Sequence, residues 1–218
     1  MTLVGNVQLV RGGTGMLPVV LEMLEREGIK TKGNLDLYAR SYAHFSIEDA
    51  RSIRDRATRG AIAGDRRVFV IAAPVIAADA QNTLLKTIEE PAGNALFIFI
   101  VPSPETLLPT VCSRAQILVL ASAEGAKHLV DEKKFLKADI PARLELLKPL
   151  LDKGEEERRD LGAIITFLSS LERVLATVKP LEHAAGLEAI YRARKYIADK
   201  GALVKPLLEQ VALLVPRV

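Results

Sequence analysis

The chain has 218 residues, 49% of them hydrophobic and 26% charged, which is enough for one large domain or two modest ones. No apolar run reaches the roughly 18 residues of a membrane-spanning helix, and the start of the chain lacks the regions of a secretory signal. The single cysteine, Cys112, excludes an intrachain disulfide. We therefore expect a cytoplasmic protein with no membrane segment. The net charge of +3 is only mildly basic and does not by itself indicate nucleic-acid binding, which usually shows as a concentrated basic face.

A glycine-rich turn follows the first predicted strand, residues 7–10. Such a turn before a helix can offer backbone amides to an anion, and phosphate-binding loops of the form GxxGxGK[ST] add a lysine for phosphate and a hydroxyl for magnesium. The matching positions here are occupied by Gly13, Thr14, Gly15, Met16 and Leu17. The thioether of Met16 carries no charge and Leu17 cannot ligate a hard cation. This degenerate Walker A loop predicts at most weak binding of phosphate or sulfate.

A helix with several arginines is predicted over Ile47–Thr58. Ser46 is a suitable N-cap, and Asp49 stands three residues later in the capping-box position. The helix and its end carry Arg51, Arg54, Arg56 and Arg59. Such a group usually forms a solvated helix surface, but it can also contact the phosphates of a DNA duplex, so both interpretations stay open. No aromatic residues interleave with these arginines in the sequence, which argues against stacking of single-stranded bases.

Apolar runs alternate with helical segments over the first 120 residues. The run Leu96–Val101 is unbroken, as expected of a strand buried on both faces of a parallel sheet. The other predicted strands are residues 7–10, 36–40, 68–71 and 117–120. This alternation predicts an α/β domain with helices on both faces of a parallel sheet.

Two helices flank the run Leu96–Val101. The first presents Leu84, Leu85 and Ile88 on one face and is ended by Glu90-Pro91. The second is a short helix that Pro104 opens and that stops at Ser113-Arg114.

The remaining polar residues predict no metal or nucleophilic site. Lys86 precedes Glu89 and Glu90 by three and four residues, which is the spacing of a surface ion pair. The three histidines, His44, His128 and His183, have no partner at ligand or triad spacing. Cys112 has no histidine near it in the sequence and is better explained by packing.

After residue 120 the strand signal stops and helical patterns take over. The apolar stripes run over Leu161–Leu175, Leu187–Ile197 and Leu203–Leu214. We therefore expect an all-α second domain. The predicted boundaries are a sheet domain over 1–121, a linker helix over 122–134 and a helical domain over 135–218.

The stretch Ala80–Leu118 resembles the AAA+ domain of bacterial DNA polymerase III clamp-loader subunits. LLKTIEEP, a strand, LLPT and SRA stand here in the order of that family's LLKxLEEP, strand, LLPT and SRC, and Ile53-Arg54 matches its IR pair. The resemblance implies a P-loop-like AAA+ sheet domain followed by a helical collar domain. The segments 135–151 and 191–216 resemble the first and last helices of that collar. The linker helix would then be a reduced form of the family's lid.

The resemblance also implies which functional groups are lost and which are kept. Active members carry two acidic residues after the third strand, where this chain has Ala72 and Ala73. Together with the changed loop, this predicts no nucleotide or metal cofactor and no ATP hydrolysis. In the family, the arginine of the SRC motif reaches the ATP of the neighbouring subunit. Arg114, next to Ser113, is therefore the expected arginine finger, acting in trans.

The chain most resembles the delta-prime branch of the family, in a short form. The implied role is a stator that completes the loader ring during sliding-clamp loading in DNA replication. The implied partners are the gamma/tau ATPase subunits, the delta subunit, the sliding clamp and primer-template DNA. Two alternatives are a divergent but active ATPase and a free-standing DNA-binding or regulatory AAA+ scaffold.

Overall fold

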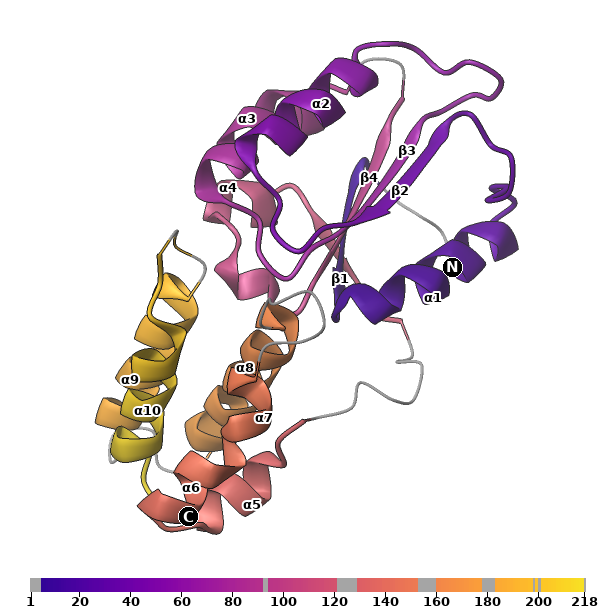
Figure 1. The fold of residues 1–218 in the computed structure, drawn as a ribbon. Coiled ribbons are helices and arrows are strands. Elements are labelled where there is room, and N and C mark those ends of the chain that lie inside the picture. Colours follow the sequence, from indigo (N-terminus) through magenta and orange to yellow (C-terminus); the bar gives the residue numbers. More distant parts are fainter. Residues whose placement is uncertain are drawn as a thin grey trace. The chain divides into compact units, whose positions relative to one another are not determined.

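The alternating apolar runs form a parallel five-stranded sheet (Figure 1). In the computed structural model its strands lie in the order β2-β3-β4-β1-β5. Their bounds are β1 Val7–Arg11, β2 Leu37–Ser41, β3 Val68–Ala72, β4 Leu96–Val101 and β5 Gln116–Leu118. The described residues are 5–91, 94–120, 129–152, 160–177, 183–197, 199 and 201–217. Each strand begins within one residue of its predicted start, but β5 ends at Leu118 instead of residue 120.

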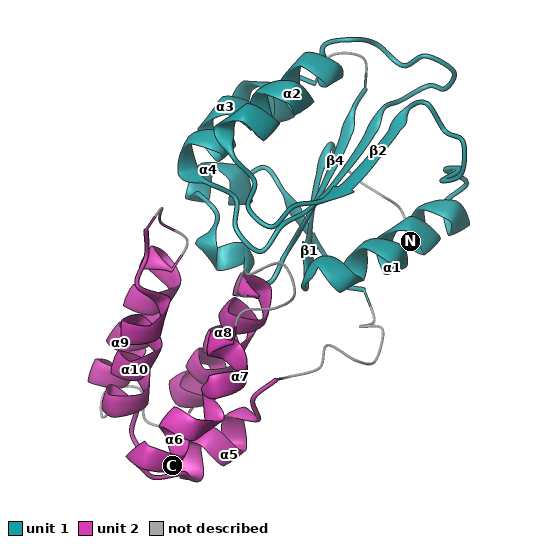
Figure 2. Ribbon diagram, viewed as in Figure 1, with its two compact units in different colours: residues 1–126 teal, residues 127–218 magenta. Residues whose placement is uncertain are grey.

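The chain divides into two compact units, Met1–Ala126 and Lys127–Val218 (Figure 2). The sheet lies in the first unit, and every described regular element of the second is a helix. The predicted class, an α/β domain with a parallel sheet followed by an all-α region, is confirmed. Residues 122–128 of the predicted linker helix lie outside the described residues, and the first helix of the second unit begins at Glu132.

Helices cover both faces of the sheet in the first unit (Figure 1). Helix α1 (Leu17–Arg26) lies on one face, and its apolar side packs on Val68, Val70 and other sheet residues. The opposite face carries α2, α3 and α4, which span Ile47–Ala57, Ala78–Glu89 and Pro109–Cys112. All residues of β3 and β4 are buried, because both faces of these central strands are covered.

Local sequence signals fix the ends of several helices. Ser46 and Asp49 form the predicted capping box at the start of α2, with the Ser46 amide 2.9 Å from the Asp49 carboxylate. A buried carboxylate, Asp36, stands directly before β2. Asp36 is 5% exposed and accepts the amides of Ile62, Ala63 and Gly64. These amide hydrogen bonds lower the pKa of Asp36 below its usual range.

Prolines and caps divide the second unit into more helices than the sequence predicted. The expected helix over residues 135–151 is broken, because Asp139 caps a new helix whose second residue is Pro141, and Pro149 follows in the next one. The segment 191–216 is likewise interrupted near Gly201, whose φ is +87°. The helices are α5 Glu132–Lys137, α6 Ile140–Leu146, α7 Lys148–Leu151, α8 Leu161–Thr177, α9 Ala184–Tyr196 and α10 Val204–Leu214.

The core of the second unit follows the predicted stripes only in part. On α8, Ile164, Leu168, Leu171 and Leu175 are buried as expected. At α10 the two ends of the stripe are exposed, because Leu203 precedes the helix and Leu214 ends it, while Val204 and Ala212 are buried in their place.

A buried arginine joins three parts of the second unit. Arg143, on α6, is 3% exposed and donates to five backbone carbonyl groups, and to no carboxylate of the residues that the structure describes. The acceptors are Phe135, Leu136, Ala212, Val215 and Pro216. These carbonyls lie in or just after α5 and α10, near the ends where helix dipoles favour a positive charge. The segment after α10 also passes close to α9, since a Cβ on Gly186 would lie 3.0 Å from the Val215 Cα.

None of the described helices is both long and apolar enough to cross a bilayer.

Candidate functional site

The loop after β1 is filled by a side chain of the core. The 3-10 helix η1 (Thr14–Met16) leads directly into α1, and Met16 is only 7% exposed. Its side chain packs in the apolar cluster that contains Val10, Ala72 and Ile100. It also folds across Gly12, where an added Cβ would lie 2.4 Å from the Met16 Cγ. The place that a phosphate-binding lysine would occupy is therefore part of the hydrophobic core.

The end of β3 is equally apolar. Ala72 and Ala73 are 0% and 1% exposed, and their backbone groups are used within the fold. The Ala72 carbonyl accepts the Tyr42 amide at 2.8 Å, and the Ala73 amide donates to Ile100 at 3.0 Å. Neither the loop after β1 nor this strand end offers a charged or metal-ligating side chain at the predicted positions. These residues do not fit a magnesium nucleotide.

Metal-ligating side chains do not gather elsewhere among the residues that the structure describes. No group of three or more histidine, cysteine, aspartate or glutamate side chains in these residues could hold a metal ion. His128 lies outside them.

Arg114 lies just beyond the last turn of α4, where its side chain is 38% exposed. Its Nη1 donates to the Thr110 carbonyl at 2.8 Å and lies 3.2 Å from the Ser113 Oγ. Its Nη2 lies 2.6 Å from the Glu89 Oε1 on α3. The predicted site residues Ser113 and Arg114 are thus close together, and the guanidinium group is both held and accessible.

The segment before Arg114 differs from the single short helix that we expected. It consists of the 3-10 helix η2 (Pro104–Thr106) and the separate helix α4, because Leu107 and Leu108 have extended backbone conformations. Gln81 of α3 stabilises this break, since its Oε1 accepts the Leu108 amide at 2.7 Å. Gln81 is 4% exposed. This role of Gln81 was not predicted from the sequence, although a polar residue on the apolar face of a helix is a signal that could have indicated it.

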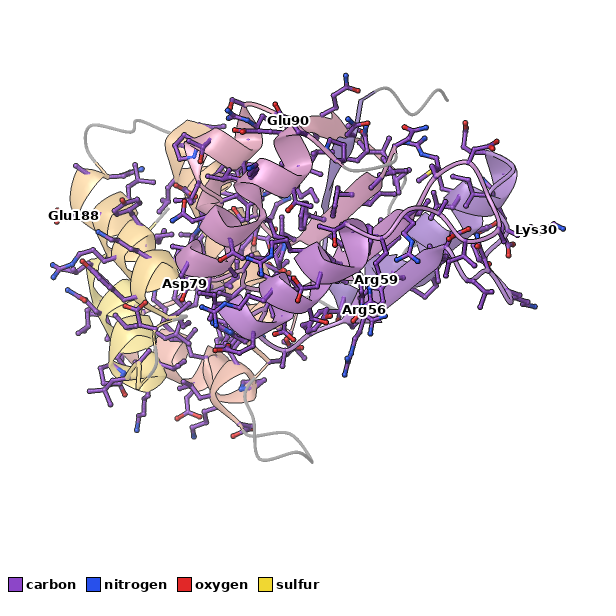
Figure 3. The ribbon with its side chains drawn as sticks, turned by 90° about the horizontal axis from the view of Figure 1, so that it is seen from above. Lys30, Arg56, Arg59, Asp79, Glu90 and Glu188 are labelled. Carbon is purple, nitrogen blue, oxygen red and sulfur yellow. The ribbon has the colours of Figure 1, made fainter. Side chains whose placement is uncertain are left out.

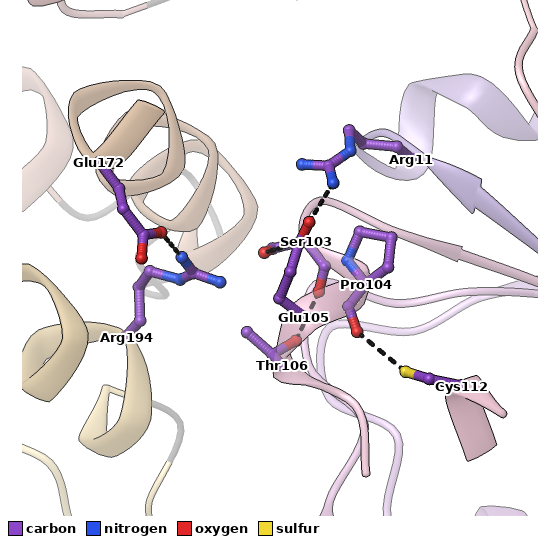
Figure 4. A network of polar contacts seen from close by, with 8 residues as sticks. All are labelled: Arg11, Ser103, Pro104, Glu105, Thr106, Cys112, Glu172 and Arg194. Carbon is purple, nitrogen blue, oxygen red and sulfur yellow. Dashed lines mark hydrogen bonds and ion pairs between the residues drawn. The ribbon is translucent and has the colours of Figure 1, made fainter. Parts of the chain in front are cut away.

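A polar network holds η2 next to the end of β1 (Figure 4). Glu105 pairs with Arg11 and accepts the Ser103 hydroxyl at 2.6 Å. Desolvation raises the pKa of Glu105, but the hydrogen bonds from Ser103 and Arg11 outweigh it, so the net pKa is lowered. The same view shows the Cys112 Sγ directed at the Pro104 carbonyl, 3.5 Å away. Burial, followed by the charge of Glu105, raises the pKa of this thiol, which makes it a poor nucleophile.

The ion pair predicted within α3 is replaced by a long-range one. Glu89 pairs with Arg114, and no ion pair of Lys86 occurs among the described residues. Sequence spacing could not indicate this, because the two partners are 25 positions apart, Glu89 at the end of α3 and Arg114 just beyond α4.

The arginine group of α2 lies on the surface of the unit. Arg51, Arg54, Arg56 and Arg59 are all exposed, and Figure 3 labels Arg56 and Arg59 near the end of the helix. Aromatic rings do lie beside arginines on this surface, although no aromatic residues interleave with the α2 arginines in the sequence. The Arg56 guanidinium is 5.0 Å from the Tyr38 ring centre, and that of Arg40 is 5.3 Å from the Tyr42 ring centre. The rings come from β2 and the residue after it. Tyr38 and Tyr42 flank Arg40 in the sequence, but both precede α2 and do not interleave with its arginines.

Acidic residues dilute the charge of this surface. Arg54 pairs with Asp55 at 3.1 Å, and Glu48 is also exposed. The arginines therefore form a mixed surface, and nothing in their geometry separates a DNA contact from a solvated face.

Comparison with known proteins connects the chain to DNA polymerase III. Residues 26–124 match the family model described as DNA polymerase III, delta subunit. The gamma/tau subunit of DNA polymerase III from Mycobacterium tuberculosis is 37% identical over 84 residues, covering 38% of this chain and 14% of that protein. The delta' subunit of DNA polymerase III from Bacillus subtilis is 22% identical over 161 residues, covering 72% of this chain and 48% of that protein.

A solved gamma-subunit-related protein of DNA polymerase III from Thermotoga maritima is 20% identical and has a TM-score of 0.42, covering 95% of this chain and 73% of the other. The chain spans less than half the length of the Mycobacterium tuberculosis and Bacillus subtilis subunits. The matched region of the family model contains α2, α3, α4 and Arg114.

Proposed function

We propose that this chain is a delta-prime-like relative of the clamp-loader subunits of DNA polymerase III and acts as a non-hydrolysing stator. It would complete a loader ring and supply Arg114 to the ATP site of a neighbouring ATPase subunit. The observation that carries the proposal is the position of Arg114, which is exposed just beyond α4 and held by three contacts within its own unit.

A planar guanidinium group suits this role. It can donate to two phosphate oxygens at once, and an arginine finger stabilises the charge of the transferring phosphoryl group. Where one such arginine is the sole finger, it contributes about three to five powers of ten in rate. The expected contribution of Arg114 is smaller, because other interfaces in a ring of related subunits would carry fingers of their own.

The loss of hydrolysis by the chain itself is supported by the apolar loop and strand end. Met16 fills the position of the lysine, and Ala72 and Ala73 fill those of the acidic pair. All three belong to the core, so restoring one charged group would disturb the fold without rebuilding the site.

The proposed partners are those that the resemblance implies. They are the gamma/tau ATPase subunits, the delta subunit, the sliding clamp and primer-template DNA, and the assembly would work in the cytoplasm. Within it, the exposed arginines of α2 are the candidates for contact with duplex phosphates, namely Arg51, Arg54, Arg56 and Arg59.

The test is the ATPase rate of a reconstituted assembly that contains this chain, its ATPase partner, the clamp and primer-template DNA. Arg114→Ala should lower the stimulated rate, because a charge that stabilises the transferring phosphate is lost. Arg114→Lys should recover little, because a point charge does not reproduce the planar fork. Arg26→Ala is the matched control, since Arg26 is also an exposed arginine of the first unit with one ion pair, to Glu22 at 2.5 Å. If Arg114→Ala leaves the stimulated rate at the wild-type value, the role in trans is wrong.

The DNA-binding scaffold remains a second candidate because of the arginines and tyrosines at α2 and β2. A gel-shift titration of the isolated chain with duplex DNA at several salt concentrations distinguishes it. Tight binding with a steep salt dependence would favour the scaffold, since phosphate contacts release counterions.

A further inference from the structure

Helix α3 holds the segment that carries Arg114 at two separate points. Near the start of α3, Gln81 donates from Nε2 to the Ile76 carbonyl at 2.8 Å and accepts the Leu108 amide at 2.7 Å. Leu108 is the N-cap residue of α4, so this buried amide fixes where α4 begins. At the other end of α3, Glu89 reaches the guanidinium group of Arg114.

The contact with Glu89 completes the support of the guanidinium group. The other two contacts, to Thr110 and Ser113, come from the helix that leads to Arg114 and leave the outer part of the side chain free to turn. The ion pair at 2.6 Å adds a point of attachment from a different helix. Among the described residues the Nε–H of Arg114 has no partner, and the side chain remains 38% exposed. Donors are therefore still available to an incoming anion.

Glu89 is poorly explained by stability alone. It is the last residue of α3, where the helix dipole disfavours a negative charge. Its side chain is 41% exposed, and exposed ion pairs contribute little to folding. Its main effect is on the orientation of one flexible side chain, which loses less freedom on binding when it is already held.

We infer that Glu89 is a positioning residue, which holds Arg114 in the orientation in which it meets the phosphates of the neighbouring subunit. This inference rests on the proposed function of Arg114. Helix α3 would then contribute to the reaction in the neighbouring subunit through Glu89 and Arg114. Glu89 itself would not contact the nucleotide.

The experiment compares variants in the reconstituted assembly with its clamp and DNA. Glu89→Ala should lower the maximal stimulated ATPase rate by about two- to fivefold, the size of an exposed ion pair, and leave the KM for ATP unchanged. Glu89→Gln keeps an acceptor oxygen and should recover most of the rate. Glu90→Ala is the matched control, because Glu90 is the adjacent exposed glutamate (labelled in Figure 3) and forms no ion pair within the described part of the chain. In an Arg114→Ala background, Glu89→Ala should have no further effect.

The possible results distinguish the positioning role of Glu89 from the proposed role of Arg114 in trans. If Arg114→Ala has no effect, the proposed function fails. If Arg114→Ala lowers the rate but Glu89→Ala leaves it unchanged or raises it, only the positioning role is overturned. A loss that persists in the Arg114→Ala background would also overturn it, because Glu89 would then act by another route. Thermal denaturation of each variant confirms that the chain is folded.

Discussion

Two regions of the first unit carry the residues of the proposed function, and their key side chains lie in opposite environments. In the loop after β1, the position of the charged residue is taken by Met16, which packs in the core. At the end of α4, the polar residue Arg114 is kept at the surface and held by Glu89, Thr110 and Ser113. A region that faces only its own ligand can be absorbed into the core when that ligand is no longer bound. Under the proposed function, Arg114 stays at the surface because it faces a partner subunit.

The largest effect is expected at the end of β3, where Ala72 packs in the same apolar cluster as Met16. The test is to place a carboxylate there. Ala72→Asp would place a charge at a fully buried position among apolar side chains. We expect the free energy of unfolding to fall by about 4 kcal/mol or more, as for other unpaired buried charges. Urea unfolding followed by circular dichroism measures this.

The matched control is Ser41→Asp. Ser41 pairs with Ala72 across the sheet but is exposed on the edge strand β2, so its substitution should change stability by only about 0.5 kcal/mol. If Ala72→Asp is tolerated as well as Ser41→Asp, the end of β3 has solvent access and its description as core is wrong.

A smaller effect is expected from Met16→Lys. The stem of the lysine can fill part of the space and its ammonium group can reach towards the surface, so we expect a loss of about 2 kcal/mol. No ATP hydrolysis should appear in a phosphate-release assay, because no acidic residue would hold magnesium. Met16→Leu, which nearly conserves volume, should cost less than about 1.5 kcal/mol. Detectable turnover by Met16→Lys would mean that another residue already serves as a metal ligand.

Asp36 shows when a buried carboxylate is tolerated in this unit, and it predicts a pH dependence. Its three amide donors lower its native pKa below the ordinary 3.8, so it stabilises the fold above about pH 4. That stabilisation should be lost as the pH falls through the native pKa. In urea titrations between about pH 5 and pH 2, the stability of Asp36→Asn should fall less steeply than that of the wild type. Parallel profiles would show that Asp36 does not titrate differently in the folded chain.

The smallest effect on folding is expected at Arg114. Because its side chain and that of Glu89 are both partly exposed, Arg114→Ala should lower the free energy of unfolding by less than about 1 kcal/mol. Urea unfolding of the isolated chain measures this directly. A loss above about 2 kcal/mol would erase the contrast between the two regions, since Arg114 would then be a structural residue like Met16.

Features with strong local signals could be predicted from the sequence. The apolar run Leu96–Val101 is the strand β4, and the capping box of Ser46 and Asp49 starts α2 at the expected residue. Both depend on residues that are close in the chain. The break between η2 and α4 could not be predicted this way, because it is stabilised by Gln81, which lies 27 positions before Leu108.

In the candidate site, too, local features could be predicted from the sequence and long-range contacts could not. The sequence identified Met16, Ala72 and Arg114, since each occupies a known motif position. It did not show that Met16 packs across Gly12, that Glu89 selects Arg114 instead of Lys86, or that Tyr38 lies beside Arg56. Each of these facts depends on how helices and strands meet in space.

The contacts of Arg143 have a practical consequence for experiments that shorten the chain. Its guanidinium group depends on the carbonyls of Val215 and Pro216, which follow the last described helix. Deleting the segment from residue 215 onward would leave a buried positive charge without two of its acceptors, and Gly186 would lose the backbone that packs against it. A deletion series that maps partner binding to these residues would therefore report unfolding of the helical unit. Arg143 and Gly186 are the residues to substitute first, so that lost structure is not mistaken for a lost interface.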